Sequence, residues 1–143
     1  MRKITSGKKS KGQATLEMLL VLIVLVPLFF GGIELARAVS IRHSLDSGVF
    51  VATRAISLNP TDTAYAQTLV QDALTNNIFS GGAIANINYG TITWDAASCA
   101  GGKVLGCRFD ITASADYTPW IPVVGGQKIT ITIRHHGIVE KLY

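Results

Sequence analysis

The chain has 143 residues, of which 48% are hydrophobic, and a formal net charge of +4. A chain of this length holds at most one membrane segment and one small domain. The basic excess sits in residues 1–12, which carry five basic and no acidic side chains, whereas residues 13–143 carry eight basic and nine acidic ones, a net charge of −1. The overall charge therefore gives no reason to expect a nucleic-acid partner.

A charge-free apolar segment follows the basic residues. No side chain from Met18 to Ile33 is charged. The stretch from Ala14 to Ile33 is about 20 residues, or about 30 Å as a helix, which is one hydrocarbon thickness. Pro27 lies inside it, as membrane helices tolerate. Because basic residues beside such a segment stay in the cytoplasm, we expect everything after Ile33 to lie on the far side of the membrane.

Gly12 and Glu17 add a more specific feature to what could otherwise be a plain single-pass anchor. Glu17 lies five positions after Gly12, just inside the apolar segment. A carboxylate costs about 2.5–3.5 kcal/mol if it reaches the bilayer centre, so we expect Glu17 to have a function. A basic leader, then Gly, four residues, Glu and a hydrophobic helix resembles a type IV pilin-like precursor.

The helix is expected to continue beyond the apolar segment. Apolar residues recur at three- or four-residue spacing, which marks one face of an amphipathic helix: Ile41, Leu45, Val49, Ala52 and Ile56. Asn59-Pro60 ends this pattern, since a residue before proline avoids the helical region. The sequence therefore predicts one helix over residues 14–57, first transmembrane and then amphipathic.

Residues 59–143 are predicted to form an exported α+β head. Thr61 or Asp62 can cap a short helix over about 62–78. The apolar residues of that helix are Tyr65, Leu69, Ala73 and Ile78. Three segments then alternate apolar and polar residues, which predicts strands at Ile84–Trp94, Val104–Tyr117 and Lys128–Val139. Their connections suit a small three-stranded antiparallel sheet packed on the end of the long helix.

The two cysteines, Cys99 and Cys107, fall in this exported part, where disulfides form and persist. A bridge between them would restrict the unfolded chain by roughly 2.5 kcal/mol in the loop-entropy model. The alternative is a pair of free thiols or half of a metal site, but no further Cys or His stands at ligand spacing. We favour the disulfide.

No catalytic residue, cofactor site or metal site is predicted, because the sequence has no nucleophile elbow, phosphate loop or metal motif. His135 and His136 are neighbours on a predicted strand, so they point to opposite faces and cannot chelate one ion together. The loop from Thr118 to Gly126 is apolar and contains two prolines. Such a loop marks a partner contact or tucks against the sheet. The chain is not expected to be an enzyme.

A competing interpretation treats the N-terminus as an ordinary secretory signal. Ala36-Arg37-Ala38 has the small residues of a signal-peptidase site, with Met18–Ile33 as the apolar region. Cleavage after Ala38 would release a soluble exported domain. The apolar stretch is slightly long for this, and Glu34 and Arg37 crowd the site.

Four stretches resemble the TadE-like family of tight-adherence pilus proteins. They are the opening Gly12-Gln13-Ala14-x-x-Glu17, the membrane exit Gly32-Ile33-Glu34-Leu35-x-Arg37, the segment Val51-Ala52-Thr53-Arg54-Ala55, and the Thr-rich strand at 128–133 followed by Glu140. The resemblance is closest over residues 12–58. Two positions depart from the family pattern. Met18 stands where an aromatic residue is common, and Pro27 falls about one helical turn later than usual.

The resemblance implies how the chain is processed. A prepilin peptidase would cut after Gly12, remove residues 1–12 as a leader peptide and free the amine of Gln13. In a filament, the Glu17 carboxylate would face the Gln13 ammonium of a neighbouring subunit, unless Gln13 cyclises to pyroglutamate. The implied partners are this peptidase, other pilin or pseudopilin subunits, and the assembly platform of the inner membrane. No nucleic acid and no small-molecule substrate is implied.

The chain is thus predicted to be a minor pilin or pseudopilin that acts in pilus assembly or at the tip. Residues 13–58 would be the pilin-like helix, with a single pass at about 14–33, and residues 59–143 the exported head. Major pilins of these systems are little more than the helix, so the head favours a minor role. A major pilin or a secretion-system pseudopilin is the alternative within this class. The expected location is the bacterial inner membrane, N-terminus in the cytoplasm, with incorporation into a surface pilus.

Overall fold

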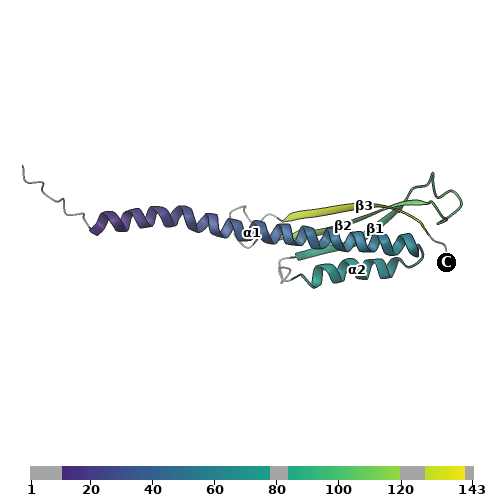
Figure 1. The fold of residues 1–143 in the computed structure, drawn as a ribbon, viewed down its shortest axis with the longest axis horizontal. Coiled ribbons are helices and arrows are strands. Elements are labelled where there is room, and N and C mark those ends of the chain that lie inside the picture. The colour runs from purple at the N-terminus through teal and green to yellow at the C-terminus, as the bar shows by residue number, and fades with distance from the viewer. Residues whose placement is uncertain (1–10, 78–83, 120–127, 141–143) are drawn as a thin grey trace, which may run out of the picture. The chain divides into compact units, whose positions relative to one another are not determined.

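The computed structural model describes residues 11–77, 84–119 and 128–140, and the chain divides into two compact units, Met1–Ile33 and Glu34–Tyr143. Helix α1 (Lys11–Leu58) contributes to both units (Figure 1). In the first unit, every described side chain from Gly12 to Ile33 is exposed, and Pro27 is accommodated without ending the helix. A helix that is apolar on all sides needs lipid or protein around it.

The second unit is a two-layer α+β fold, as predicted. The face of α1 predicted to be apolar is buried here, with Ile41, Leu45, Val49, Ala52 and Ile56 all at 0% exposure. Helix α2 (Thr63–Thr75) runs antiparallel to this half of α1, since Gly48 lies against Val70 and Ala73 while Asn77 bonds Ser40 and Ser44. The Asn77 side chain donates to the Ser44 hydroxyl at 2.6 Å and to the Ser40 carbonyl at 3.1 Å.

The face of α2 that packs inward differs from the predicted one. Its buried residues are Ala66, Val70 and Leu74, whereas Tyr65 is exposed and Ile78 lies outside the described residues. The predicted stripe is thus one residue out of phase, because both faces of this helix carry apolar side chains at the same spacing. Of the two caps predicted, Thr61 and Asp62, the structure uses Asp62, whose carboxylate accepts from the Tyr65 N–H at 3.0 Å.

The sheet is the predicted antiparallel meander, with strand order β1-β2-β3. Its strands are β1 (Ile84–Trp94), β2 (Arg108–Tyr117) and β3 (Ile129–Ile138). The pairing of β2 with β3 is unbroken, whereas β1 shifts register twice along β2, around Asn86 and Gly90. Strand β2 begins four residues later than predicted, because the residues before it form the turns that carry Cys99 and Cys107.

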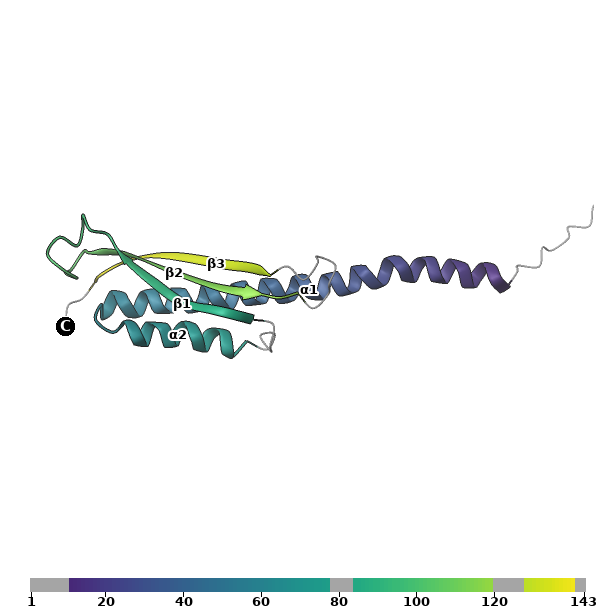
Figure 2. The same cartoon turned by 180° about the vertical axis from the view of Figure 1, so that it is seen from behind.

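The sheet lies along the second half of α1, with α2 beside that half, rather than on the helix end as predicted (Figures 1 and 2). The central strand β2 turns alternate residues toward the helices, and all of them are buried: Phe109, Ile111, Ala113, Ala115 and Tyr117. Gly137 on β3 lies opposite Phe109, and its missing side chain leaves room for the Phe109 ring. The core therefore joins one face of α1 to α2 and the sheet.

Candidate processing and assembly site

The three residues predicted to carry processing and assembly lie in the first two turns of α1. Gly12 and Gln13 are exposed, and a side chain placed at Gly12 would meet no atom within 4 Å. Glu17 is also exposed and lies one helical turn beyond Gln13, so the two residues share one side of the helix. The site is therefore open to a peptidase or to a second subunit.

The segment that follows is long and apolar enough to cross a membrane. Its large hydrophobic side chains are exposed, with Leu28 at 73% and Ile23 at 68%. A soluble surface seldom presents so much contiguous apolar area. The chain thus has one N-terminal apolar helix of the kind that anchors a protein in a membrane.

Where α1 enters the second unit, Glu34 meets a residue that the sequence did not link to it. The buried Tyr117 at the end of β2 donates its hydroxyl proton to the Glu34 carboxylate, and Arg37 lies 3.8 Å from the same carboxylate. Burial and the neighbouring Glu34 raise the pKa of Tyr117 to about 12. The hydroxyl therefore stays protonated and remains a donor to Glu34 over the physiological range.

At the other end of the same helix half, Arg54 and Glu140 form a second long-range contact. Their ion pair measures 2.6 Å and is exposed on both sides. The backbone N–H of Glu140 also donates to the Ser57 carbonyl at 2.9 Å. Residues 139–140, just after β3, are thereby tied to the end of α1.

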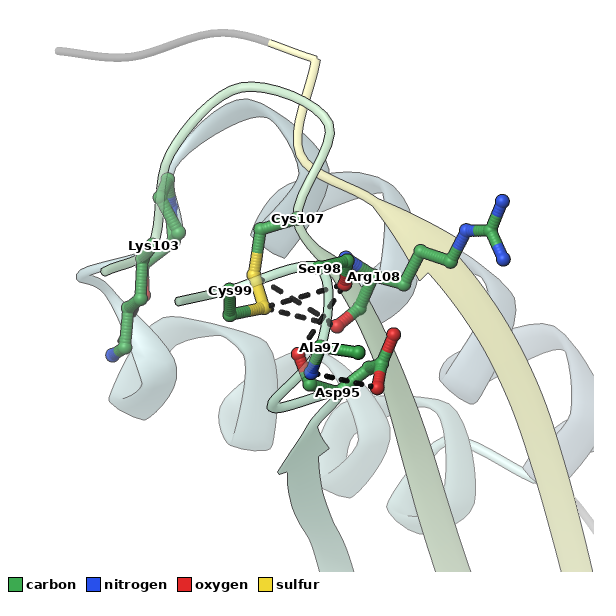
Figure 3. Close-up of a disulfide and its surroundings, with 8 residues drawn as sticks. Asp95, Ala97, Ser98, Cys99, Lys103, Cys107 and Arg108 are labelled. Atoms are coloured by element: carbon green, nitrogen blue, oxygen red, sulfur yellow. Dashed lines mark hydrogen bonds between the residues drawn. A yellow bond between two sulfur atoms is a disulfide. The ribbon is translucent and has the colours of Figure 1, made fainter. Parts of the chain in front are cut away.

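The structure contains the predicted disulfide between Cys99 and Cys107 (Figure 3). In the turn before Cys99, the Asp95 carboxylate accepts from the Ala97 N–H at 3.2 Å. A hydrogen bond from Ser98 lowers the pKa of Asp95. The Ser98 hydroxyl in turn accepts from the Arg108 N–H at 2.9 Å. The bridge therefore closes the loop directly before β2.

The same loop contacts the rest of the head through Lys103. Its ammonium group donates to the Pro60 carbonyl at 3.2 Å and lies 4.9 Å from the centre of the Trp94 ring. Trp94 in turn packs against Phe109 with ring centres 5.2 Å apart. These contacts join the loop to the end of α1 and to the core.

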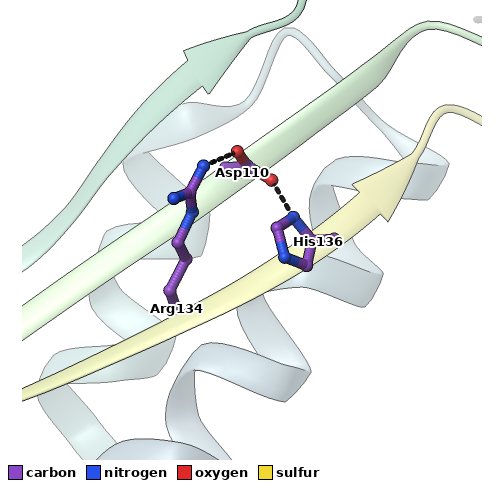
Figure 4. A network of polar contacts seen from close by, with 3 residues as sticks. All are labelled: Asp110, Arg134 and His136. Carbon is purple, nitrogen blue, oxygen red and sulfur yellow. Dashed lines mark hydrogen bonds and ion pairs between the residues drawn. The ribbon is translucent and has the colours of Figure 1, made fainter.

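The neighbouring histidines point to opposite faces of the sheet, as the sequence predicted. His135 faces α1, where its Nε2 lies 2.8 Å from Asp46. His136 faces outward, where it and Arg134 both contact Asp110 (Figure 4). Arg134 and then His136 hold the pKa of Asp110 below its usual value. Within residues 11–77, 84–119 and 128–140, no group of three or more His, Cys, Asp and Glu residues could hold a metal ion.

An open groove of about 910 Å³ lies on the head, and sequence reasoning missed it. Its lining includes Phe50, Trp94, Arg54 and Glu140. Among its lining residues, Arg54 forms an ion pair with Glu140, and His136 contacts Asp110. The groove thus offers mixed, self-paired polar groups beside aromatic rings, an arrangement suited to a contact surface more than to a reaction.

A helix that is first an exposed apolar segment and then the core of an α+β unit is the organisation of pilin-like proteins. Residues 12–54 match the family model described as TadE-like protein, which confirms the resemblance of this segment. No curated protein and no solved structure matches the chain. The likeness to TadE-like proteins thus covers residues 12–54, less than half of the chain. It includes Glu34, Arg37 and Arg54, whereas their partners Tyr117 and Glu140 lie beyond it.

Proposed function

We propose that this chain is a minor pilin or pseudopilin of a tight-adherence pilus and that a prepilin peptidase cuts it after Gly12. The observation that carries the proposal is an exposed acid, Glu17, five positions after Gly12 and the only charged residue from Gly12 through Ile33. The family match begins at Gly12 itself, which supports this residue as the boundary of the mature chain.

Electrostatics explain why the assembled state would need Glu17. A lone carboxylate near hydrocarbon is unfavourable, and the partner implied by cleavage is the new ammonium of Gln13 on a neighbouring subunit. Two unit charges about 4 Å apart attract by about 4 kcal/mol at an effective dielectric of 20. That attraction would offset the burial of Glu17 and set the axial register between subunits.

The charge distribution supports an N-terminus held in the cytoplasm. Five basic side chains precede the apolar segment, and none of the residues 1–12 is acidic. The positive-inside rule then orients the segment with its second end outward. The head would lie on the outer side of the inner membrane, where the Cys99–Cys107 disulfide is stable.

The fold also argues against release of the head by signal peptidase after Ala38. Residues 36–38 lie within α1, and Ala38 packs against the core. Cleavage there would remove Glu34 and Arg37, and so leave the buried Tyr117 hydroxyl without its acceptor. A buried donor that loses its partner costs about 1–3 kcal/mol. Cleavage after Gly12 keeps the hydrogen bond between Tyr117 and Glu34.

Intact mass and N-terminal sequencing of the protein recovered from its native membranes test the proposal. A mature chain that starts at Gln13 is expected, and its mass would also reveal methylation or cyclisation of Gln13. A start at Val39 would establish the secreted domain instead. An uncut chain would leave a single-pass anchor and refute processing.

The abundance of this chain in pili then distinguishes a minor pilin from a major pilin. Filaments sheared from cells should contain this chain at far lower amounts than the main subunit if it is a minor pilin. Equal or greater abundance would identify a major pilin.

A further inference from the structure

We infer that the end of the head next to Glu34 is a bilayer-contacting surface that rests in the headgroup region of the same membrane. Several elements of the second unit terminate at this end. Tyr117 ends β2 and contacts Glu34, while its strand partners Ile84 and Ile129 are the first residues of β1 and β3. Asn77, which follows α2, bonds Ser40 on the same stretch of α1. Glu34 directly follows Ile33, the last residue of the proposed span, so the inference assigns this end to the membrane exit.

Exposed apolar side chains gather at this end. They are Leu35 and Val39 on α1 and Ile129, the first residue of β3, and each exposes close to half of its surface or more. The opposite end of the head also exposes apolar side chains, Leu105 and Ile138, but its connections carry the charged residues Asp62, Asp95 and Lys103.

The charges that remain at this end suit phospholipid headgroups. Both acids are bonded within the head, Glu34 by Tyr117 and Asp116 by Asn86 and Thr130. The exposed Lys128 precedes Ile129 and, although it also attracts Asp116, its ammonium group can meet lipid phosphate. Exposed apolar residues beside a Lys or Arg are the pattern of a surface that enters the bilayer interface by about 5–10 Å.

The bilayer is the favoured occupant because Glu34, at this end of the head, directly follows the proposed membrane span in the chain. The inference therefore rests on the membrane insertion proposed above. Contact with a second protein subunit at the same place is the competing outcome, and the experiment below separates the two.

The two ends of β3 provide a matched pair of probe sites. Ile129 is 47% exposed at the Glu34 end, and Ile138 is 50% exposed at the opposite end of the same strand. The full chain would carry Ile129→Cys or Ile138→Cys, labelled with the fluorophore NBD, while Cys99 and Cys107 stay oxidised. A third variant, Leu22→Cys, reports on the span. The labelled proteins would be reconstituted in phosphatidylcholine–phosphatidylglycerol vesicles that contain doxyl spin-labelled lipid.

We expect spin-labelled lipid to quench NBD at position 129 several-fold more strongly than NBD at position 138, with strong quenching at position 22. Quenching at 22 but equal, weak quenching at 129 and 138 would overturn the bilayer surface and leave the span intact. Blue-shifted emission at 129 without lipid quenching would assign the surface to a protein partner instead. Absence of quenching at 22 would refute the membrane insertion, and this inference with it.

Discussion

Glu17 and Glu34 are two carboxylates on one helix with different surroundings. Glu17 is exposed on the described part of α1, whereas the Glu34 carboxylate accepts from Tyr117 and lies beside Arg37. The sequence singled out both acids, Glu17 through its spacing from Gly12 and Glu34 through the family resemblance. It did not reveal Tyr117, because a contact across 83 residues leaves no local pattern.

At Glu17, the substitution Glu17→Ala should leave cleavage after Gly12 intact and prevent incorporation into pili. Loss of an ion pair of about 4 kcal/mol would lower incorporation by more than about tenfold. Immunoblots of sheared filaments and of membranes would measure assembly and processing separately. Glu17→Asp keeps the charge and is the matched control, which should assemble far better than Glu17→Gln. Normal incorporation of Glu17→Ala would refute the register role.

At Tyr117, the substitution Tyr117→Phe should lower the free energy of unfolding of the head by about 1.5–3 kcal/mol, the range for a hydrogen bond to a charged group. Denaturant unfolding of the full chain in detergent, followed by circular dichroism, would measure it. Tyr65→Phe is the control, because Tyr65 is exposed and surface changes stay within about 0.5 kcal/mol. Equal stability of both variants would contradict the role of this contact.

The raised pKa of Tyr117 also predicts a pH dependence. The tyrosine ionises near pH 10 when unfolded and near 12 when folded, so the unfolded state loses its proton first. The contribution of Tyr117 to stability is therefore complete below pH 10 and falls as pH rises toward 12. The stability difference between wild type and Tyr117→Phe should shrink across this window, and a constant difference would contradict the shift.

Among the elements, helix periodicity predicted α1 well and α2 only in part. The apolar face from Ile41 to Ile56 recurs at every third or fourth residue, and between these two residues only Phe50 and Val51 are large exposed apolar side chains. In α2, neighbouring stripes through Tyr65 and through Ala66 are both apolar, and packing into the core shared with α1 and the sheet buries the second. Tertiary packing therefore determines which face of α2 is buried, which the local sequence pattern did not.

The close approach of α1 and α2 predicts that position 48 accepts no side chain. A Cβ atom there would lie 2.8 Å from Ala73 Cβ and 3.2 Å from Val70 Cα, a backbone atom that cannot rotate away. Gly48→Leu should lower the free energy of unfolding by about 1–3 kcal/mol. The same side chain at the exposed neighbour, Ser47→Leu, should change stability by less than about 0.5 kcal/mol. Thermal unfolding compares the two, and similar midpoints would contradict the packing.

The loop closed by Cys99 and Cys107 should stabilise the head by about 2.5 kcal/mol. We expect a reducing agent to lower the unfolding free energy by that amount in the wild type. The double variant Cys99→Ala/Cys107→Ala should already be less stable and should not respond to the reductant. A wild type that does not respond while its thiols are shown to be free would refute a stabilising bridge.

At the scale of the whole molecule, the head depends on α1. Four large side chains of α1 are fully buried, Ile41, Leu45, Val49 and Ile56, and each contributes roughly 1.5–3 kcal/mol. Their sum is comparable to the entire stability of a small domain. A chain of residues 34–143 should therefore unfold cooperatively, whereas a chain of residues 59–143 should not. Circular dichroism melting curves would test this, and a cooperative transition in the shorter chain would contradict it.

The sequence indicated the helices and the sheet but not the side-chain contacts that connect them. Alternation in residues 84–138 predicted three strands, since each inward residue of β2 is apolar. The contacts of Tyr117 with Glu34, of His135 with Asp46 and of Glu140 with Arg54 bring together residues more than 80 positions apart. Only a three-dimensional arrangement assigns such partners. The groove beside Arg54 was missed for the same reason.

The tie between Glu140 and α1 has a mechanical consequence. The N–H of Glu140 bonds Ser57 and its carboxylate bonds Arg54, so the last described residues are fastened to the helix itself. A force applied beyond Glu140 would therefore divide between two paths, the covalent chain into β3 and these two bonds into α1. The helix would share a load that the sheet would otherwise carry alone.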